Sequence, residues 1–261
     1  MDAVAELRGQ VWNMAQSPHG TWVVQDALDN APDDVGRIQL VHELKGHVWD
    51  ALRCPFGNHV LQKCLTVVHA GATQFVVDEL LGAGHGAILC AAKHQYGCRV
   101  LQRILEHLST HQLTTLVHEL VAQSGKLSKH LYGHYVIRSL LEQCPGDAHQ
   151  IVSLAIGRDI ESTMRSRYGR AVVADALTFG GEEDQRVLAH TLAVAGSWLH
   201  FVGRPGSRYL PTIARRMLLL LPGHQAQAMR DSLMAAECGL KHHRVGRKLL
   251  AMRENPPRPA D

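Results

Sequence analysis

The chain has 261 residues, of which 46% are hydrophobic, 20% are charged and only 5% are aromatic, and its formal net charge is +3. This composition excludes a disordered chain, and the excess of Leu, Val and Ala over aromatic residues favours helices over a β-sandwich. No stretch approaches the roughly 18 apolar residues of a membrane span, and residues 1–10 lack the order of a signal peptide, so we expect a soluble intracellular protein without a membrane partner.

The cysteines are scattered along the chain, whereas charged residues are distributed unevenly. The six cysteines form no CxxC pair, which favours reduced thiols in the cytosol or nucleus over a disulfide scaffold. Residues 1–160 hold 12 Lys and Arg against 15 Asp and Glu, whereas residues 161–261 hold 15 against 9. The C-terminal part can therefore hold a polyanion, and the N-terminal part cannot do so by charge alone.

A short pattern recurs along the chain: a glycine, two variable residues, two apolar residues, and further apolar residues one turn later. The copies are GTWVVQDAL from Gly20, GNHVLQKCL from Gly57, GCRVLQRIL from Gly97, GHYVIRSLL from Gly133, GRAVVADAL from Gly169, and the weaker GSRYLPTIA from Gly206 and GRKLLAMRE from Gly246. Successive glycines lie 37, 40, 36, 36, 37 and 40 residues apart. This regular spacing indicates a repeat protein.

Each unit also has an apolar-periodic segment before its glycine, for example at residues 38–52 and 113–125. A helical hairpin of this kind cannot cover its own apolar face and must stack on its neighbours. We therefore predict an all-α fold, a curved α-solenoid of about seven repeats over residues 1–253. The first four repeats are well formed and the last three degenerate. Residues 254–261, ENPPRPAD, are expected to form a disordered tail.

The helix after each glycine has two different faces. In the second unit Val60, Leu61, Cys64 and Leu65 share one stripe, which is the natural buried side. The residues at the first, second and fifth positions after the glycine fall on another stripe, and stacking would align them into a row. These triplets are Thr21, Trp22 and Gln25; Asn58, His59 and Gln62; Cys98, Arg99 and Gln102; and His134, Tyr135 and Arg138.

The chemistry of these positions suits nucleobases. The second position holds a flat group, Trp, His, Arg or Tyr, which can stack on a base. The glutamines at the fifth position offer one donor and one acceptor to a base edge. This pattern favours single-stranded RNA read at one base per repeat, with each stacked base contributing roughly 1–3 kcal/mol.

These repeats resemble those of the Pumilio (PUF) family, most closely in HQYGCRVLQRILEHL at 94–108, and also in GNHVLQKCL, YGHYVIRSLLE and the final GRKLLA. The resemblance implies that the first and fifth positions contact the base edge, that the second position stacks, and that the chain runs antiparallel to the RNA. It further implies base identities at three repeats: uridine at Asn58 and Gln62, adenine at Cys98 and Gln102, and adenine at Thr21 and Gln25. Together these bases give 5′-AUA-3′ at the 3′ end of the site. Arg138 stands where the family has Gln and offers only donors, so we expect cytosine or guanine at the fourth repeat.

The C-terminal repeats depart from this pattern. Ala171 and Ala174 can neither stack nor pair well, and Pro211 lacks a backbone donor and must lie at a late helix start. We therefore expect a phosphate clamp that is indifferent to sequence in this part of the chain. Its candidate residues are Arg170, Arg208, Arg247 and Lys248.

The resemblance implies docking on messenger RNA, often in a 3′ untranslated region, to alter translation or decay through protein co-regulators. We expect a cytoplasmic monomer, with the nucleus or nucleolus also open. Two alternatives remain: a nucleolar PUF-like factor that grips ribosomal RNA with little sequence preference, and a HEAT- or armadillo-like scaffold that binds proteins. A peptide groove, however, has no reason to repeat a stacking group and a glutamine at one register.

Two other motifs contain residues of the types that bind metals. The histidines of HELKGH at 42–47 lie five residues apart, whereas a zinc protease needs them one turn apart. Cys90, His94 and Cys98 have helical spacing, but Gly97 interrupts them and no fourth ligand is evident. No catalytic arrangement recurs, so we expect no metal, no cofactor and no enzymatic activity.

Overall fold

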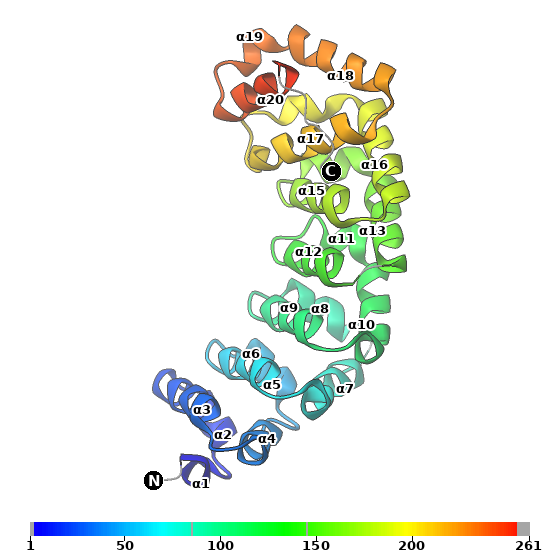
Figure 1. Ribbon diagram of the computed structural model, residues 1–261. Helices are drawn as coiled ribbons and strands as arrows, with labels where there is room; N and C mark the ends of the chain where they lie inside the picture. Colours follow the sequence, from blue (N-terminus) through cyan, green and yellow to red (C-terminus); the bar gives the residue numbers. More distant parts are fainter. Residues whose placement is uncertain (1–2, 85, 145, 255–261) are drawn as a thin grey trace. The chain divides into compact units, whose positions relative to one another are not determined.

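The computed structural model describes residues 3–84, 86–144 and 146–254 and divides into two compact units, Met1–Leu120 and Val121–Asp261 (Figure 1). Every element in the described residues is an α-helix or a 3₁₀ helix, and the predicted all-α repeat solenoid is confirmed. A single domain over residues 1–253 stays a prediction. Of the predicted tail, Glu254 is the last residue of a helix, and residues 255–261 lie outside the described residues.

The first unit consists of short helices connected by tight turns. They are α1 (Ala3–Leu7), α2 (Val11–Ala15), α3 (Pro18–Asn30), α4 (Asp34–His42), α5 (Val48–Arg53), α6 (Gly57–Val67), η1 (Ala70–Thr73), α7 (Gln74–Gly82), α8 (Ala87–Lys93), α9 (Gly97–His107) and α10 (Thr110–Ala122). The last of these crosses the division between the units.

The second unit continues the same order of long and short helices. They are α11 (Ser124–Leu127), α12 (Gly133–Gln143), α13 (Asp147–Gly157), α14 (Ile160–Arg165), α15 (Gly169–Phe179), α16 (Glu182–Ala195), η2 (Ser197–Phe201), η3 (Ser207–Tyr209), α17 (Leu210–Leu220), α18 (Gly223–Ala235), α19 (Glu237–Leu240) and α20 (Arg244–Glu254).

Each repeat has three helices where the periodicity predicted two. The apolar segment 38–52 is broken between α4 and α5 at Gly46, whose φ of +80° is readily adopted only by glycine. The segment 113–125 is likewise divided between α10 and α11. Each repeat therefore consists of a first helix, which we call the outer helix, a short second helix and a third helix. We call the third helices the row helices: α3, α6 and α9 in the first unit, and α12, α15, α17 and α20 in the second.

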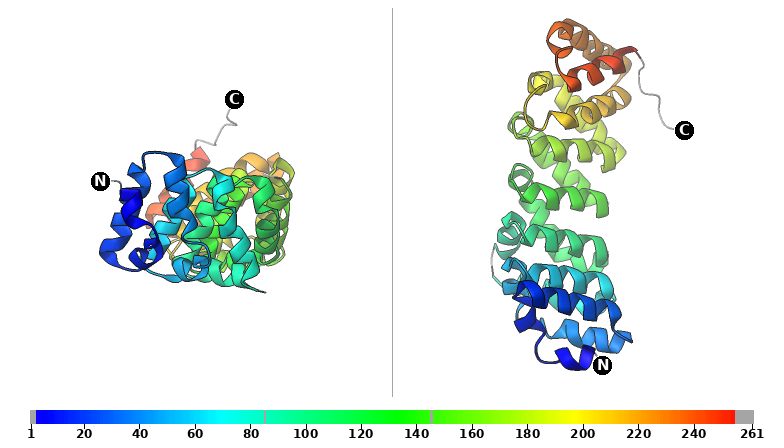
Figure 2. Two further views of the ribbon diagram at one scale, coloured as in Figure 1. Left: turned by 90° about the horizontal axis from the view of Figure 1, so that it is seen from below. Right: turned by 90° about the vertical axis from the view of Figure 1, so that its left-hand side faces the viewer.

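The row helices pack against one another in order within each unit, as the parallel helices of Figure 2 show. The repeated glycine has a steric reason, since a Cβ at Gly97 would lie 2.5 Å from the carbonyl oxygen of Ala91 and 2.8 Å from the side chain of Leu52. The end of the short helix thus crosses the start of the row helix too closely for any side chain. This crossing recurs at Gly20, Gly133, Gly169 and Gly246, which explains why glycine is needed at these positions.

The predicted core stripe is confirmed. On α6, Val60, Leu61, Cys64 and Leu65 are all at most 2% exposed. Burial raises the pKa of the Cys64 thiol to about 12, so it packs as a neutral apolar group. The apolar stripe at the equivalent positions of α9 is buried in the same way.

Glutamates near the ends of α4 and α7 join neighbouring repeats in the first unit. The carboxylate of Glu79 accepts hydrogen bonds from the backbone N–H groups of Gly46 at 2.7 Å and Val48 at 3.3 Å. Glu43 binds Gly9 and Val11 in the same way one repeat earlier. These carboxylates satisfy otherwise unpaired donors at the starts of α5 and α2. The glutamate of HELKGH therefore has a structural role.

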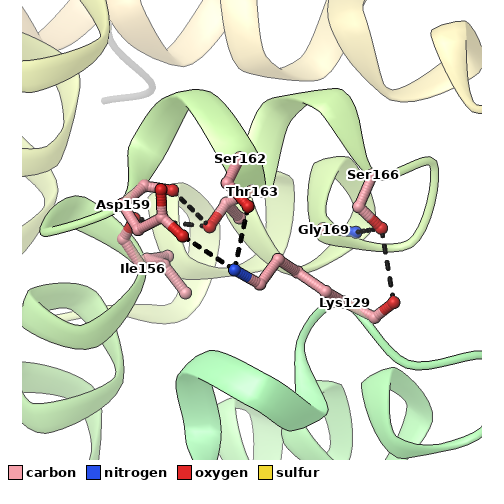
Figure 3. Close-up of polar contacts among 7 residues, drawn as sticks. All are labelled: Lys129, Ile156, Asp159, Ser162, Thr163, Ser166 and Gly169. Atoms are coloured by element: carbon pink, nitrogen blue, oxygen red, sulfur yellow. Dashed lines mark hydrogen bonds and ion pairs between the residues drawn. The ribbon is translucent and has the colours of Figure 1, made fainter.

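In the second unit a lysine and a serine connect two repeats (Figure 3). Nζ of Lys129 lies 2.8 Å from Oδ2 of Asp159 and donates to Oγ of Ser162 at 2.9 Å. Oγ of Ser166 donates to the carbonyl oxygen of Lys129 at 3.5 Å and accepts from the backbone N–H of Gly169 at 3.3 Å. The hydrogen bond from Lys129 lowers the pKa of Asp159, which keeps the pair charged.

Among the described residues, no single helix is long and apolar enough to cross a membrane. The segments Ala70–Gly82 and Ala87–Lys93 meet the length and composition criteria only when taken together, and they are bent by 105° at their break.

Candidate nucleic-acid interface

Three flat side chains project from consecutive row helices of the first unit. Trp22 on α3 is 73% exposed, although it is among the most apolar residues of the chain. His59 on α6 and Arg99 on α9 are also exposed, and each occupies the second position after its glycine. Because α3 packs on α6 and α6 on α9, exposed flat side chains stand at the same helix position on three neighbouring helices. The exposure predicted for these three residues is confirmed, and their contact with bases stays a prediction.

The glutamines one turn further on are half-buried, and neighbouring side chains fix their orientation. Nε2 of Gln25 donates to the carbonyl oxygen of Thr21 at 3.1 Å and to its Oγ1 at 3.3 Å. Nε2 of Gln62 donates to Oδ1 of Asn58 at 2.9 Å. Both amides are therefore held through their nitrogen, which directs their oxygen toward other donors.

The amide on α9 is bound through its other end. Nη1 of Arg99 donates to Oε1 of Gln102 at 3.3 Å. The bond engages Nε2 in Gln62 and Oε1 in Gln102, so Gln62 keeps its Oε1 atom and one N–H for another partner, and Gln102 keeps both of its N–H donors. Two glutamines at equivalent positions are therefore held through opposite ends of the amide, a difference that the sequence does not reveal.

The first member of each triplet is buried, whereas the sequence predicted that it is presented. Asn58 is 1% exposed, and its Nδ2 donates to the carbonyl oxygens of Cys54 at 2.8 Å and Pro55 at 3.0 Å. The reason is that this position faces carbonyls that directly follow the short helix α5 and need donors. Thr21, Cys98 and His134 are also buried and bond to backbone carbonyls. The prediction of exposure is wrong for these residues, and their contact with a base edge stays a prediction.

In the second unit His134 lies inside an aromatic stack. Its ring centroid is 4.0 Å from that of Tyr135 and 4.8 Å from that of Tyr168. Nδ1 of His134 lies 3.0 Å from the carbonyl oxygen of His130. Burial lowers the pKa of His134, so its ring is neutral in the folded protein near neutral pH. Tyr135, half-buried, is the member of the triplet that can meet a base.

Arg138 is engaged by a carboxylate of the next repeat. Its Nε lies 2.5 Å from Oδ2 of Asp175 on α15, and its guanidinium carbon lies 5.7 Å from the ring centroid of Tyr209. The ion pair uses one of the donors expected to read a base, and the remaining donors stay candidates for that role.

The prediction that Arg170 binds phosphate is wrong. This side chain is 2% exposed, and its guanidinium donates to the carbonyl oxygens of Met164 and Pro205 and lies 5.0 Å from the ring centroid of Phe201. Its position follows from the same geometry that buries Asn58, since the first residue after the glycine faces backbone carbonyls. Arg208, Arg247 and Lys248 are exposed, and their phosphate contacts stay predictions.

A cap that was not predicted from the sequence lies three residues before the glycine in four of the repeats. Nδ1 of His94 lies 3.3 Å from the backbone nitrogens of both Tyr96 and Gly97 and accepts their hydrogen bonds. The corresponding acceptors are His130, Ser166 and Ser17. The signal was present as His or Ser at this fixed offset. No group of three metal-binding side chains occurs in the described part of the chain, and the cap accounts for His94.

These features define an α-helical repeat protein whose stacked third helices display flat and amide side chains in register. A sequence profile described as the Pumilio-family RNA binding repeat matches residues 10–45, 54–81, 92–121 and 125–155. The chain belongs to the Pumilio family. The Pumilio repeat is a binding fold.

Among curated relatives, the Pumilio homology domain family member 4 of Saccharomyces cerevisiae is 32% identical over 120 residues, which are 44% of this chain and 13% of that protein. A Pumilio domain-containing protein of Schizosaccharomyces pombe is 32% identical over 138 residues, which are 52% of this chain and 19% of that protein. The chain thus spans less than a fifth of the length of either relative.

Solved structures confirm the fold. The crystal structure of PUF-8 in complex with PBE-RNA has a TM-score of 0.79 at 19% identity and covers 97% of this chain and 73% of that one. The Puf3 RNA binding domain bound to a Cox17 RNA 3′ UTR site has a TM-score of 0.78 at 22% identity and covers 96% and 75%.

Proposed function

We propose that this chain binds single-stranded RNA through the row of side chains on α3, α6 and α9. The observation that carries the proposal is the repetition of an exposed flat group followed one turn later by an oriented amide, on three helices packed in order. The profile of the Pumilio-family RNA binding repeat and the RNA-bound state of the solved relatives support it.

The base sequence that we propose is 5′-AUA-3′. Family resemblance gives adenine at α9, uridine at α6 and adenine at α3. The different orientations of Gln62 and Gln102 support different bases at α6 and α9, because Gln62 is held through its nitrogen and Gln102 through its oxygen.

A fluorescence polarisation assay tests this proposal. An RNA of ten nucleotides that contains AUA is compared with RNAs in which each of the three bases is changed in turn. We expect each change to weaken binding several-fold or more. Equal binding of all the RNAs would contradict base reading, and absence of binding would leave the protein-interaction scaffold.

A second candidate is RNA binding with little sequence preference, as in a nucleolar Pumilio-like factor. The burial of Asn58 and Cys98 favours it, because edge contacts from the first position are then withdrawn and stacking dominates. Tight binding without discrimination in the same assay would support this candidate.

At the level of the cell, we propose that the chain acts as a monomer in the cytoplasm on the translation or decay of messenger RNA, together with protein co-regulators. Crosslinking of bound RNA in cells, with fractionation, tests this role. Enrichment of AUA sites in 3′ untranslated regions is the expected result, whereas a predominance of ribosomal RNA in nucleoli would contradict it.

A further inference from the structure

The repeat that contains α15 keeps the fold of its neighbours but displays no side chain at the positions that would contact a base. The residues at the first, second and fifth positions after Gly169 are Arg170, Ala171 and Ala174, and each is at most 2% exposed. The guanidinium of Arg170 donates to backbone carbonyl groups. This repeat still contributes to the row helices, because the residue at its sixth position, Asp175, reaches the preceding repeat.

The carboxylate of Asp175 accepts a hydrogen bond from the row helix α12. Its Oδ2 atom lies 2.5 Å from Nε of Arg138, and the two side chains are 17% and 30% exposed. A charge-assisted hydrogen bond that is largely shielded from water is stronger than an exposed one. The ring centroid of Tyr209 also lies 5.7 Å from the guanidinium carbon. The guanidinium is therefore held by two groups, both from segments that follow α12 in the chain.

The first three row helices orient the residue at the fifth position differently. Gln25 and Gln62 are bound to the first residue of their own triplets, and Gln102 is bound to the second. In α12 the first residue, His134, is engaged elsewhere: its Nδ1 atom lies 3.0 Å from a backbone carbonyl oxygen, and its ring packs against two tyrosines. The residue at the fifth position of α12 is therefore oriented by the next repeat.

The ion pair decides which donors of Arg138 are available to a base. A guanidinium has one N–H at Nε and two at each Nη atom, all in a fixed plane. Nε is bound to Asp175, and within the described parts of the chain neither Nη group donates to a carbonyl or a carboxylate. Two parallel donors match two adjacent acceptors, which cytosine has at O2 and N3 and guanine has at O6 and N7. Uridine and adenine have no such pair of adjacent acceptors.

We infer that Asp175 is a positioning residue, which determines base selection by the fourth repeat through Arg138. The inference rests on the proposed function and extends it by one base, the one that precedes AUA. With the carboxylate in place, the guanidinium is oriented and its charge is compensated, so it favours a base edge over a phosphate. Without the carboxylate, the guanidinium reorients and binds the phosphate backbone irrespective of the base. Loss of Asp175 should thus lower selectivity and strengthen non-specific binding, a combination that a purely structural role would not produce.

The experiment is fluorescence polarisation with four RNAs of ten nucleotides that differ only in the base before AUA. The variants are Asp175→Ala, Arg138→Gln and the double substitution. The matched control is Asp159→Ala, which removes the carboxylate of another ion pair between repeats of the same unit, the pair with Lys129 (Figure 3). Thermal unfolding by circular dichroism identifies any variant that has lost its fold. If Asp175→Ala is such a variant, Asp175→Asn, which keeps the volume of the side chain, takes its place.

We expect the wild type to bind the RNA with its preferred base, cytosine or guanine, about tenfold more tightly than the RNA with uridine. Asp175→Ala should reduce this ratio to about twofold or less. It should also steepen the salt dependence of binding by about 0.7 in the slope of log K against log salt, as one further phosphate contact does. In the Arg138→Gln background the same substitution should change neither quantity, and Asp159→Ala should leave both as in the wild type.

The inference would be overturned by an unchanged ratio in folded Asp175→Ala, by an equal loss of the ratio in Asp159→Ala, or by the same loss in the absence of Arg138. RNAs with altered AUA, measured alongside, separate this inference from the proposed function. If AUA is selected and Asp175→Ala discriminates at the preceding base as the wild type does, only the role of Asp175 is wrong. If altering AUA has no effect on binding, the proposed base sequence fails as well.

Discussion

On α6 the amide of Gln62 is bound to the residue one turn before it, with Nε2 of Gln62 2.9 Å from Oδ1 of Asn58. Asn58 itself is held by two carbonyls of the preceding segment, so a chain of hydrogen bonds runs from the short helix to the surface of the row helix. This chain fixes which atom of Gln62 faces outward and connects the fold to the proposed base preference.

The first prediction concerns that orientation. Gln62→Glu replaces the donor toward Asn58 with an acceptor-only carboxylate, so the bond is lost and the outward group changes. We expect binding of an RNA with uridine at this position to weaken by roughly 1–3 kcal/mol, with preference moving toward guanine by family analogy. Polarisation with four RNAs that differ at this base measures it. Gln150→Glu, on the exposed face of α13, is the control, and an unchanged order of the four RNAs for Gln62→Glu would contradict base reading at α6.

The second prediction concerns Trp22. Because this side chain is 73% exposed, Trp22→Ala should leave the free energy of unfolding nearly unchanged. RNA affinity should fall by roughly 1–3 kcal/mol through loss of one stacked base. Urea unfolding and polarisation measure the two effects, and the indole fluorescence lost in the variant should be the component that RNA quenches. A large loss of stability would instead show that Trp22 belongs to the core.

The third prediction concerns the glutamates between repeats. Glu79→Gln removes the carboxylate that accepts from Gly46 and Val48, and we expect a loss of about 1 kcal/mol in the free energy of unfolding. Glu119→Gln provides a matched control, because Glu119 likewise lies directly before a leucine near the end of its helix, α10, and is exposed. Urea unfolding of both variants tests the comparison, and equal effects would contradict the role of the Glu79 carboxylate.

The fourth prediction is a loss of stability in acid. Burial lowers the pKa of His94 in the folded protein, with the charge of Arg53 lowering it further, and its Nδ1 can cap α9 only when neutral. The unfolded chain therefore binds the proton more tightly. The stabilisation is fully present above the unfolded-state pKa of about 6.5 and declines as the pH falls from there through the folded pKa.

His94→Ser tests this mechanism, because serine performs the same cap at Ser17 and Ser166 and does not titrate. Urea unfolding at pH 7.5 and 5.5 should show a smaller acid loss in the variant than in the wild type. His134, whose pKa burial also lowers, accounts for part of the loss that remains. An identical loss in both proteins would rule out His94 as a source.

The fifth prediction concerns Arg170. Arg170→Met keeps much of the buried volume but leaves the carbonyl oxygens of Met164 and Pro205 without their donor, at a cost of about 3 kcal/mol in unfolding free energy. Arg208→Met, at an exposed site, should cost less than about 0.5 kcal/mol. Thermal or urea unfolding compares the two variants. Equal losses in the free energy of unfolding would show that the buried hydrogen bonds of Arg170 do not stabilise the fold.

The repeat itself could be predicted from the sequence because glycine spacing and apolar periodicity are local signals. The steric crossing at Gly97 and the buried stripe of α6 are the physical counterparts of those signals. The break at Gly46 was not predicted, since the apolar period continues through it and only the backbone conformation shows the turn.

The candidate site was predictable only in part. The exposure of Trp22 and the register of the glutamines follow from helical geometry. The burial of Asn58 and Arg170 does not, because it depends on carbonyl groups of the preceding short helix that compete with a ligand for the same donors. A polar residue at a helix start can serve either partner, and the sequence alone does not distinguish them.

The carboxylate bonds of Glu43 and Glu79 also restrict how this chain can be re-engineered. The backbone N–H groups at the start of one short helix donate to a carboxylate about 33 residues later. A repeat excised at its own glycine would therefore contain either the donors or the acceptor of each connection, but not both. Grafted or shuffled modules should therefore be exchanged with the following outer helix attached. A boundary drawn after Glu79 keeps donors and acceptor in one piece, and a boundary drawn before it separates them.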